Sequence, residues 1–201
     1  MHESTPKRRV LVTIAFAACC ILSTRAPSSA RANPSSHRGA ATAAGTTLDW
    51  PNYGGDAAGT RYAPIAAITT ANAGRLRLAW SFHTGVSGPK TSFEATPVVA
   101  DGRLYIAAPD DEVFALDPTS GRLLWHFLPH LSPDAWPSKL NRGVAYGDGR
   151  VYLATLDARL IAIDAATGRQ DWQFQLQDPR YSYFESMAPL YDRGRVVVGV
   201  S

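Results

Sequence analysis

Histidine is the side chain of this sequence best suited to transition-metal chemistry, because neutral imidazole is the commonest metal ligand in proteins. His126 and His130 are four residues apart, a spacing that on a helix would place both rings on one face. Pro129 lies between them and excludes such a helix. The five histidines show no other zinc-like spacing. The sequence therefore predicts no metal site within this chain.

The amino-terminal segment has the three parts of a secretory signal peptide. Three basic residues (7–9) precede an apolar run (10–22) that is too short to span a bilayer, and an A-x-A site follows. We therefore expect residues 1–32 to be removed on export to the periplasm. Cys19 and Cys20 would leave with this segment, so the mature chain is expected to contain no disulfide.

Two other interpretations of this segment are open. One is an amino-terminal anchor that is not cleaved. The other is a lipoprotein, because residues 16–19, "FAAC", loosely resemble a lipoprotein cleavage box. Phe16 stands where a leucine is usual in such a box, so lipoprotein anchoring is the less favoured alternative.

The charge of the chain changes once the leader is set aside. The whole chain has a formal charge of +3, but residues 1–32 hold five basic residues and one acidic residue. The remainder has 15 basic and 16 acidic residues, or about −1, so we expect no nucleic-acid partner. We also expect no transmembrane span in the mature chain. Residues 33–47 are small and polar without an apolar period, which predicts a flexible linker.

From Leu48 onward the sequence repeats itself. Residues 115–125 and 162–172 share the pattern Ala-x-Asp-x-x-(Ser/Thr)-Gly-x-x-x-Trp, 47 residues apart. Superposing 102–127 on 149–174 needs no gap and gives 11 identities in 26 positions. Partial copies at 78–82 and 192–199 flank these units, so the chain contains a tail, two full units and the opening of a fourth.

Each unit contains four short runs rich in β-forming residues. In the first unit they lie at 95–100, 103–108, 112–117 and 122–127. Asp-Gly at 101–102 predicts a tight hairpin, and 148–149 repeats it. No stretch of the mature chain shows a convincing 3.6-residue period, so the fold class is all-β.

A four-stranded sheet with two apolar faces cannot bury both faces alone, but it can when copies stack radially around an axis. We therefore predict a β-propeller of four-stranded antiparallel blades, incomplete here, with about two full blades and two partial ones. The tryptophan that ends each unit is large enough to bridge to the next blade and to bond a turn there. The alternative, a core tryptophan of a β-sandwich, does not explain its fixed spacing from the turn glycine.

The repeated element resembles the tryptophan-docking motif of the eight-bladed quinoprotein dehydrogenases. These periplasmic enzymes use pyrroloquinoline quinone (PQQ) and calcium to oxidise alcohols or sugars. Further stretches follow the order of that family, at 49–65, 76–85, 92–117, 141–165 and 185–201. The resemblance implies that residues 48–201 are the amino-terminal part of such a propeller. It also implies an alcohol, polyol or sugar substrate and a cytochrome or quinone electron acceptor.

The resemblance implies that four residues of this sequence bind the cofactor: Glu94, Arg142, Ser186 and Ser201. Arginine is the informative one, because a guanidinium binds a carboxylate through two parallel hydrogen bonds and PQQ carries several carboxylates. Each residue also has a plain structural interpretation, as a solvated charge at a strand edge, a loop-rim charge or a strand cap.

One departure from the family concerns the cofactor's face. Alcohol-oxidising members have two adjacent cysteines just before the Asn-Arg-Gly, and their disulfide packs on the quinone. Residues 132–143 contain no cysteine, and Trp136 lies about where the pair would be. A flat aromatic ring could cover a flat quinone in the same way, so Trp136 is a further candidate. The missing pair leaves the substrate open.

The second departure concerns length. Eight units of about 47 residues need several hundred residues, and in the family the calcium ligands and the catalytic base come later in the chain. We therefore name no catalytic residue, place the calcium ligands beyond residue 201, and expect these 201 residues alone to be inactive. The alternatives are a non-enzymatic β-propeller binding scaffold, such as an outer-membrane assembly factor, or an inactive truncated gene product.

Overall fold

The computed structural model describes residues 48–56 and 58–201. The expected signal peptide (1–32) and linker (33–47) lie outside the described residues and stay predictions. Within the described part, no helix is long and apolar enough to cross a membrane.

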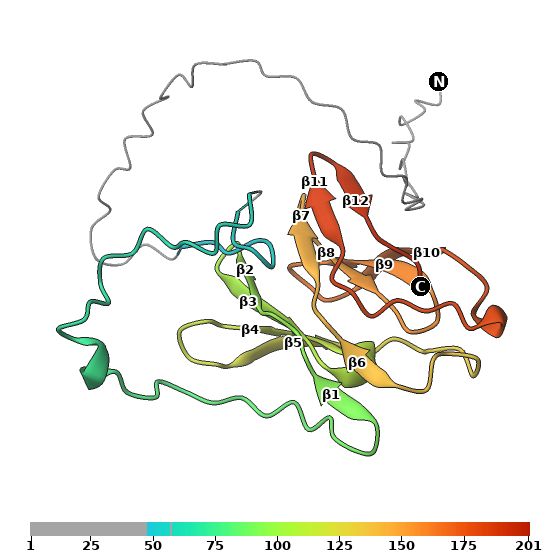
Figure 1. Cartoon of the computed structure of the whole chain (residues 1–201), viewed down its shortest axis with the longest axis horizontal. Coiled ribbons are helices and arrows are strands. Elements are labelled where there is room, and N and C mark those ends of the chain that lie inside the picture. The colour runs from blue at the N-terminus through green and yellow to red at the C-terminus, as the bar shows by residue number, and fades with distance from the viewer. Residues whose placement is uncertain (1–47, 57) are drawn as a thin grey trace, which may run out of the picture.

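The described chain is built of three antiparallel sheets and one short parallel strand pair, with three short 3₁₀ helices as its only helical turns (Figure 1). The first blade has the order β2-β3-β4-β5, and its strands are β2 (Val98–Ala100), β3 (Arg103–Ala107), β4 (Val113–Leu116) and β5 (Leu123–Phe127). The second has the order β10-β9-β8-β7, and its strands are β7 (Ala145–Gly147), β8 (Arg150–Ala154), β9 (Arg159–Asp164) and β10 (Gln170–Gln175). The remaining elements outside the lead-in strands are the hairpin β11 (Leu190–Asp192) and β12 (Arg195–Val197), and the helices η1 (Ala73–Arg75), η2 (Pro109–Asp111) and η3 (Pro179–Tyr181). The predicted all-β propeller with two full blades is confirmed.

The hairpin turns follow the turn chemistry of the sequence. Asp101 and Gly102 have φ of +49° and +68°, and Asp148 and Gly149 have +48° and +71°. Two successive left-handed residues are what a two-residue type I′ hairpin requires. The segment 78–82, in contrast, forms no strand, because it has no partner strand among the described residues.

The central strands β8 and β9 of the second blade bury both of their faces, and successive residues contact different neighbours. In β9, Ile161 and Ile163 belong to the core shared with the first blade, while Leu160 and Ala162 belong to the core shared with Val196 of β12. Since side chains alternate across a strand, a run of apolar residues fills two interfaces at once. The blades therefore stack face to face, as radial packing requires.

Two of the three repeat tryptophans dock onto the turn of the next unit. Trp80 Nε1 donates to the carbonyl of Pro118 at 3.0 Å, and Trp125 Nε1 donates to the carbonyl of Ala165 at 3.0 Å. Both carbonyls directly follow the aspartate of the repeat, so the two contacts are equivalent. The indole of Trp172 packs in the second core, and its Nε1 makes no hydrogen bond with the described residues. The predicted docking is thus observed twice.

The turn glycines leave room for these indoles. Gly168 has φ +75°, and a Cβ there would lie 2.7 Å from the ring of Trp125. Gly149 has φ +71°, but a Cβ there would meet nothing within 4 Å. The two positions therefore share a left-handed backbone, and only Gly168 has a ring lying against it.

This pair gives a matched stability test of docking. Both Gly149→Ala and Gly168→Ala should lose about 1–2 kcal/mol for the left-handed conformation. We expect Gly168→Ala to lose a further ~1–3 kcal/mol, because its methyl group overlaps the indole. Urea unfolding measures both losses. Equal losses would show that Trp125 does not lie against this turn in solution.

A second contact between blades is also repeated, and the sequence did not indicate it. Tyr105 stacks on Tyr146 with ring centroids 5.9 Å apart, and Tyr152 stacks on Tyr191 at 5.6 Å. The Tyr146 hydroxyl also hydrogen-bonds the Asp101 carboxylate in the preceding blade's hairpin. Each tyrosine pair joins neighbouring blades close to their first strands.

Short lead-in strands precede the blades and pair in parallel with each other. β1 (Thr91–Phe93) pairs with β6 (Lys139–Asn141), and the two lie side by side in Figure 1. Glu94 directly follows β1, and Arg142 directly follows β6. The Arg142 N–H then donates to the Ser186 carbonyl at 2.9 Å, which brings the lead-in of the β11–β12 hairpin to the same place.

Candidate cofactor-binding site

The lead-in segments bring three of the predicted site residues into direct contact. Arg142 Nη1 donates to Ser186 Oγ at 2.7 Å, and Arg142 Nε lies 3.1 Å from Glu94 Oε2 in an ion pair. Glu94, Arg142 and Ser186 occupy corresponding places, three or four residues before the first strands of successive units. The propeller topology therefore joins residues that are 92 positions apart at its ends.

Glu94 and Arg142 of this cluster line a hollow on the surface. The hollow has a volume of about 370 Å³, and its walls are formed by Tyr53, Glu94, Arg142, Met187 and Ala188. The Arg142 side chain is 50 % exposed, so a ligand can reach it. Its Nη2 makes no hydrogen bond with the described residues. A half-exposed guanidinium with a free edge, next to a hydroxyl, is a receptor for carboxylates.

Ser201 and Trp136 lie against the same segment through Phe184. The backbone N–H of Phe184 donates to the carbonyl of Ser201 at 3.3 Å, and the Ser201 N–H donates back at 3.4 Å. Trp136 stacks on the Phe184 ring, with centroids 4.6 Å apart and planes 12° from parallel. Since Phe184 is two residues from Ser186, all five predicted residues belong to one connected group. Phe184 itself was not predicted, because a single aromatic residue in a loop has no distinguishing pattern.

A buried carboxyl group lies behind this group. Glu185 is 1 % exposed, and its Oε1 accepts a hydrogen bond from the Ser201 N–H at 3.2 Å. Burial raises the pKa of Glu185 to about 7, and the hydrogen bond from Ser201 opposes the rise. The buried Glu185 carboxyl group therefore holds a proton under mildly acidic conditions. The carboxylate that pairs with Arg142 is the exposed Glu94.

The raised pKa predicts a pH-dependent stability. Between pH 4.5 and 7 the folded state keeps the Glu185 proton and the unfolded state releases it, so this contribution is present below pH 4.5 and lost as pH rises through 7. Glu185→Gln removes the titration. We expect the free energy of unfolding of the variant, relative to wild type, to increase by about 2–3 kcal/mol from pH 5 to pH 8. Urea unfolding at both pH values measures this, and a pH-independent difference would contradict it.

The two spaced histidines have structural contacts instead. His126 Nε2 lies 2.6 Å from Glu112 Oε2, and its ring stacks on Phe114 with centroids 4.2 Å apart. The carbonyl of His130 accepts a hydrogen bond from Arg159. Over the part of the chain that the structure describes, no group of three His, Cys, Asp or Glu side chains could hold a metal ion.

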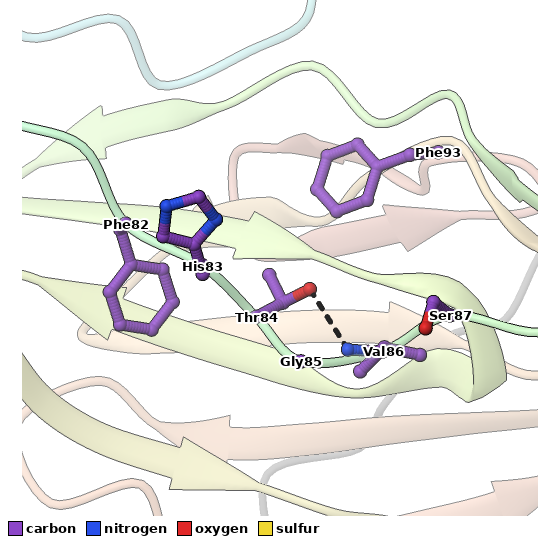
Figure 2. A pocket seen from close by; sticks show the side chains of 7 residues that line it. All are labelled: Phe82, His83, Thr84, Gly85, Val86, Ser87 and Phe93. Atoms are coloured by element: carbon purple, nitrogen blue, oxygen red, sulfur yellow. Dashed lines mark hydrogen bonds between the residues drawn. The ribbon is translucent and has the colours of Figure 1, made fainter.

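A second hollow, of about 410 Å³, shares no lining residue with the hollow beside Arg142. Figure 2 shows its lining, which comes from residues 82–87 and from Phe93. The rings of Phe82, His83 and Phe93 surround it, and the Thr84 hydroxyl accepts from the Val86 N–H at 3.2 Å within the same loop. Because no Arg, Lys, Asp or Glu lines this hollow, it lacks the charge that a polycarboxylate needs.

The sequence pattern of one protein family, described as "Glucose/ethanol/alcohol dehydrogenase, beta-propeller domain", matches residues 50–193. This match includes Glu94, Arg142 and Ser186 and both complete blades. The chain belongs to this PQQ dehydrogenase family. Its membership confirms the resemblance that the docking repeat indicated.

Relatives in this dehydrogenase family act on different compounds. The chain is 44 % identical over 101 residues to the 1-butanol dehydrogenase (cytochrome c) of Thauera butanivorans, a match that covers 48 % of this chain and 14 % of that enzyme. It is 36 % identical over 104 residues to the quinoprotein glucose dehydrogenase of Escherichia coli, covering 49 % of this chain and 13 % of that enzyme.

Solved structures of the family share the fold. A europium-containing methanol dehydrogenase superposes with a TM-score of 0.70 at 34 % identity, covering 76 % of this chain and 27 % of its own. The quinohemoprotein alcohol dehydrogenase ADHIIG of Pseudomonas putida HK5 also gives 0.70, at 38 % identity, covering 77 % and 23 %. The chain thus spans well under a third of the length of the relatives it matches.

Proposed function

We propose that this chain binds PQQ through Arg142 and Ser186 and forms part of a periplasmic dehydrogenase for an alcohol, polyol or sugar. The observation that carries the proposal is that Arg142, which lines one hollow together with Glu94, contacts both Glu94 and Ser186. Membership of the family supports the choice of cofactor.

The residues present suit a flat polyanion. The free edge of the Arg142 guanidinium would receive one carboxylate of PQQ, and the Ser186 hydroxyl would donate a further hydrogen bond. Glu94 orients the guanidinium plane through its ion pair at Nε. This ion pair leaves Nη2 of Arg142 available to the ligand. Trp136, which is 38 % exposed and already stacked on Phe184, would cover one face of the ring system.

The bound quinone would supply the electron-accepting chemistry, and the residues of this chain would fix its position. Calcium, with ligands outside the residues described, and a cytochrome or quinone as electron acceptor complete the proposal. The similarity to the 1-butanol dehydrogenase (cytochrome c) of Thauera butanivorans supports such an acceptor. No residue of this chain is assigned as the catalytic base.

Tryptophan fluorescence tests this proposal directly. We expect PQQ to quench the emission of the wild-type chain, because a quinone stacked near an indole quenches its excited state. In Trp136→Leu most of this quenching should disappear. Trp172→Phe is the matched control and should leave the PQQ-dependent quenching unchanged, since Trp172 packs in the second core. Full quenching in Trp136→Leu would show that another ring faces the cofactor.

A further inference from the structure

The strand that leads to Arg142 is held by the η2 turn of the first blade. Lys139 Nζ lies 2.8 Å from Asp110 Oδ2, and Asn141 Nδ2 donates to Asp111 Oδ1 at 2.8 Å. Lys139 and Asn141 are alternate residues of β6, so both side chains point to the same side of the strand. Two neighbouring aspartates thus bind the strand at two points.

The inner of these contacts is fully buried. Asp111 is 0 % exposed and Asn141 is 1 % exposed. The second oxygen of Asp111 accepts a hydrogen bond from the Leu156 N–H at 2.6 Å. Asp111 therefore joins β6 to the loop between β8 and β9, and both of its oxygens are used.

Asn141 transfers this restraint to the residue after Arg142. Its Oδ1 accepts from the Gly143 N–H at 2.8 Å, and its Nδ2 also donates to the Ala154 carbonyl at 3.1 Å. Arg142 is therefore fixed on both sides, by the residue before it and by the residue after it. The Arg142 N–H itself donates to the carbonyl of Ser186.

The blade does not need a carboxylate at position 111. The corresponding residue of the second blade is Ala158, 47 positions later. Ala158 has φ +56° and Asp111 has φ +61°, so the same left-handed turn forms without the acid. Burial raises the pKa of Asp111 to about 7, so the carboxylate is kept there against a desolvation cost. The fold of the blade leaves this acid unexplained.

We propose that Asp111, supported by Asp110, is a positioning residue that fixes Arg142 through Asn141 and so preorganises the carboxylate receptor. A long guanidinium side chain loses rotamer freedom when it binds a ligand, and a backbone that is already fixed reduces this cost. The choice of PQQ as the ligand of this receptor rests on the proposed function, whereas the restraint on Arg142 does not.

Amide hydrogen exchange of the ligand-free chain tests the restraint. Asp111→Asn cannot accept from both Asn141 and Leu156, because a carboxamide has a single acceptor oxygen. We expect exchange of the Gly143 amide to rise by about tenfold or more, the effect of one lost buried hydrogen bond. Asp117→Asn is the matched control, since Asp117 accepts three hydrogen bonds in the turn after β4 and should leave Gly143 unchanged. Unchanged exchange at Gly143 in Asp111→Asn overturns the proposal.

A PQQ titration tests whether the restraint acts through Arg142. Asp111→Asn should raise the Kd for PQQ about tenfold, and the increase should vanish in an Arg142→Ala background. A tenfold increase that persists without Arg142 overturns the positioning role. Lys139→Met, at a half-exposed site, is a milder second variant and should shift both readouts in the same direction. If the wild type binds no PQQ, the proposed function fails, and the exchange experiment still decides whether Asp111 fixes Arg142.

Discussion

Arg142→Ala is expected to weaken PQQ binding by ~1.5–3 kcal/mol, or about 10- to 150-fold in Kd. The reason is the loss of charge-assisted hydrogen bonds from the guanidinium to a cofactor carboxylate. Removing the side chain also leaves the Glu94 carboxylate facing an anionic ligand without its partner. Equilibrium titration, followed by absorbance or fluorescence, measures the change.

Two controls make this result specific. Arg142→Lys keeps the charge but loses the planar pair of donors, so its Kd should fall between those of the wild type and the alanine variant. Arg169→Ala removes an exposed arginine from the β9–β10 turn and should leave the Kd unchanged. An unchanged Kd in Arg142→Ala would remove this residue from the cofactor site.

Trp125→Ala should cause the largest loss of stability, about 3–5 kcal/mol in the free energy of unfolding. The indole fills the core between the two blades, and its Nε1 is bonded to the Ala165 carbonyl. Trp125→Phe keeps most of the ring but leaves this buried carbonyl with only the longer contact from the Tyr105 hydroxyl, at 3.3 Å. Trp125→Phe should therefore lower the free energy of unfolding by less, about 1–2 kcal/mol.

Trp172 provides the comparison for this prediction. It occupies the same place in the repeat but is only partly buried, and its Nε1 has no hydrogen-bond partner among the described residues. Trp172→Ala should therefore destabilise the chain less than Trp125→Ala. Urea unfolding monitored by circular dichroism gives both values, and equal losses would show that docking does not stabilise the blades.

The sequence predicts the contacts that recur with the repeat. Trp80 and Trp125 dock on equivalent carbonyls because they occupy the same place in the matching segments 78–82 and 123–127, and equal places in repeated units give equivalent contacts. The Asp-Gly hairpins are predictable for a local reason, since both residues must adopt left-handed conformations. Strand ends differ from prediction by up to three residues, because pairing rather than composition decides where a strand begins.

Some features that the sequence did not indicate depend on contacts without a copy in the next unit, unlike the repeated tyrosine pairs. Asn141 meets Asp111 over a separation of 30 residues, and the second blade has an alanine in place of that acid. The parallel pairing of β1 with β6 is similar, because short polar lead-ins have no apolar alternation. The family resemblance named Glu94, Arg142 and Ser186 as cofactor-binding residues, but no sequence pattern indicated the contacts of Arg142 with the other two.

A crystal structure of the chain with PQQ bound tests the central claim most directly. We predict that one carboxylate of PQQ lies within hydrogen-bond distance, about 3 Å, of the Arg142 guanidinium, with the Ser186 hydroxyl donating nearby. PQQ bound elsewhere, with Arg142 paired only to Glu94 and Ser186 as in the free chain, would contradict the account.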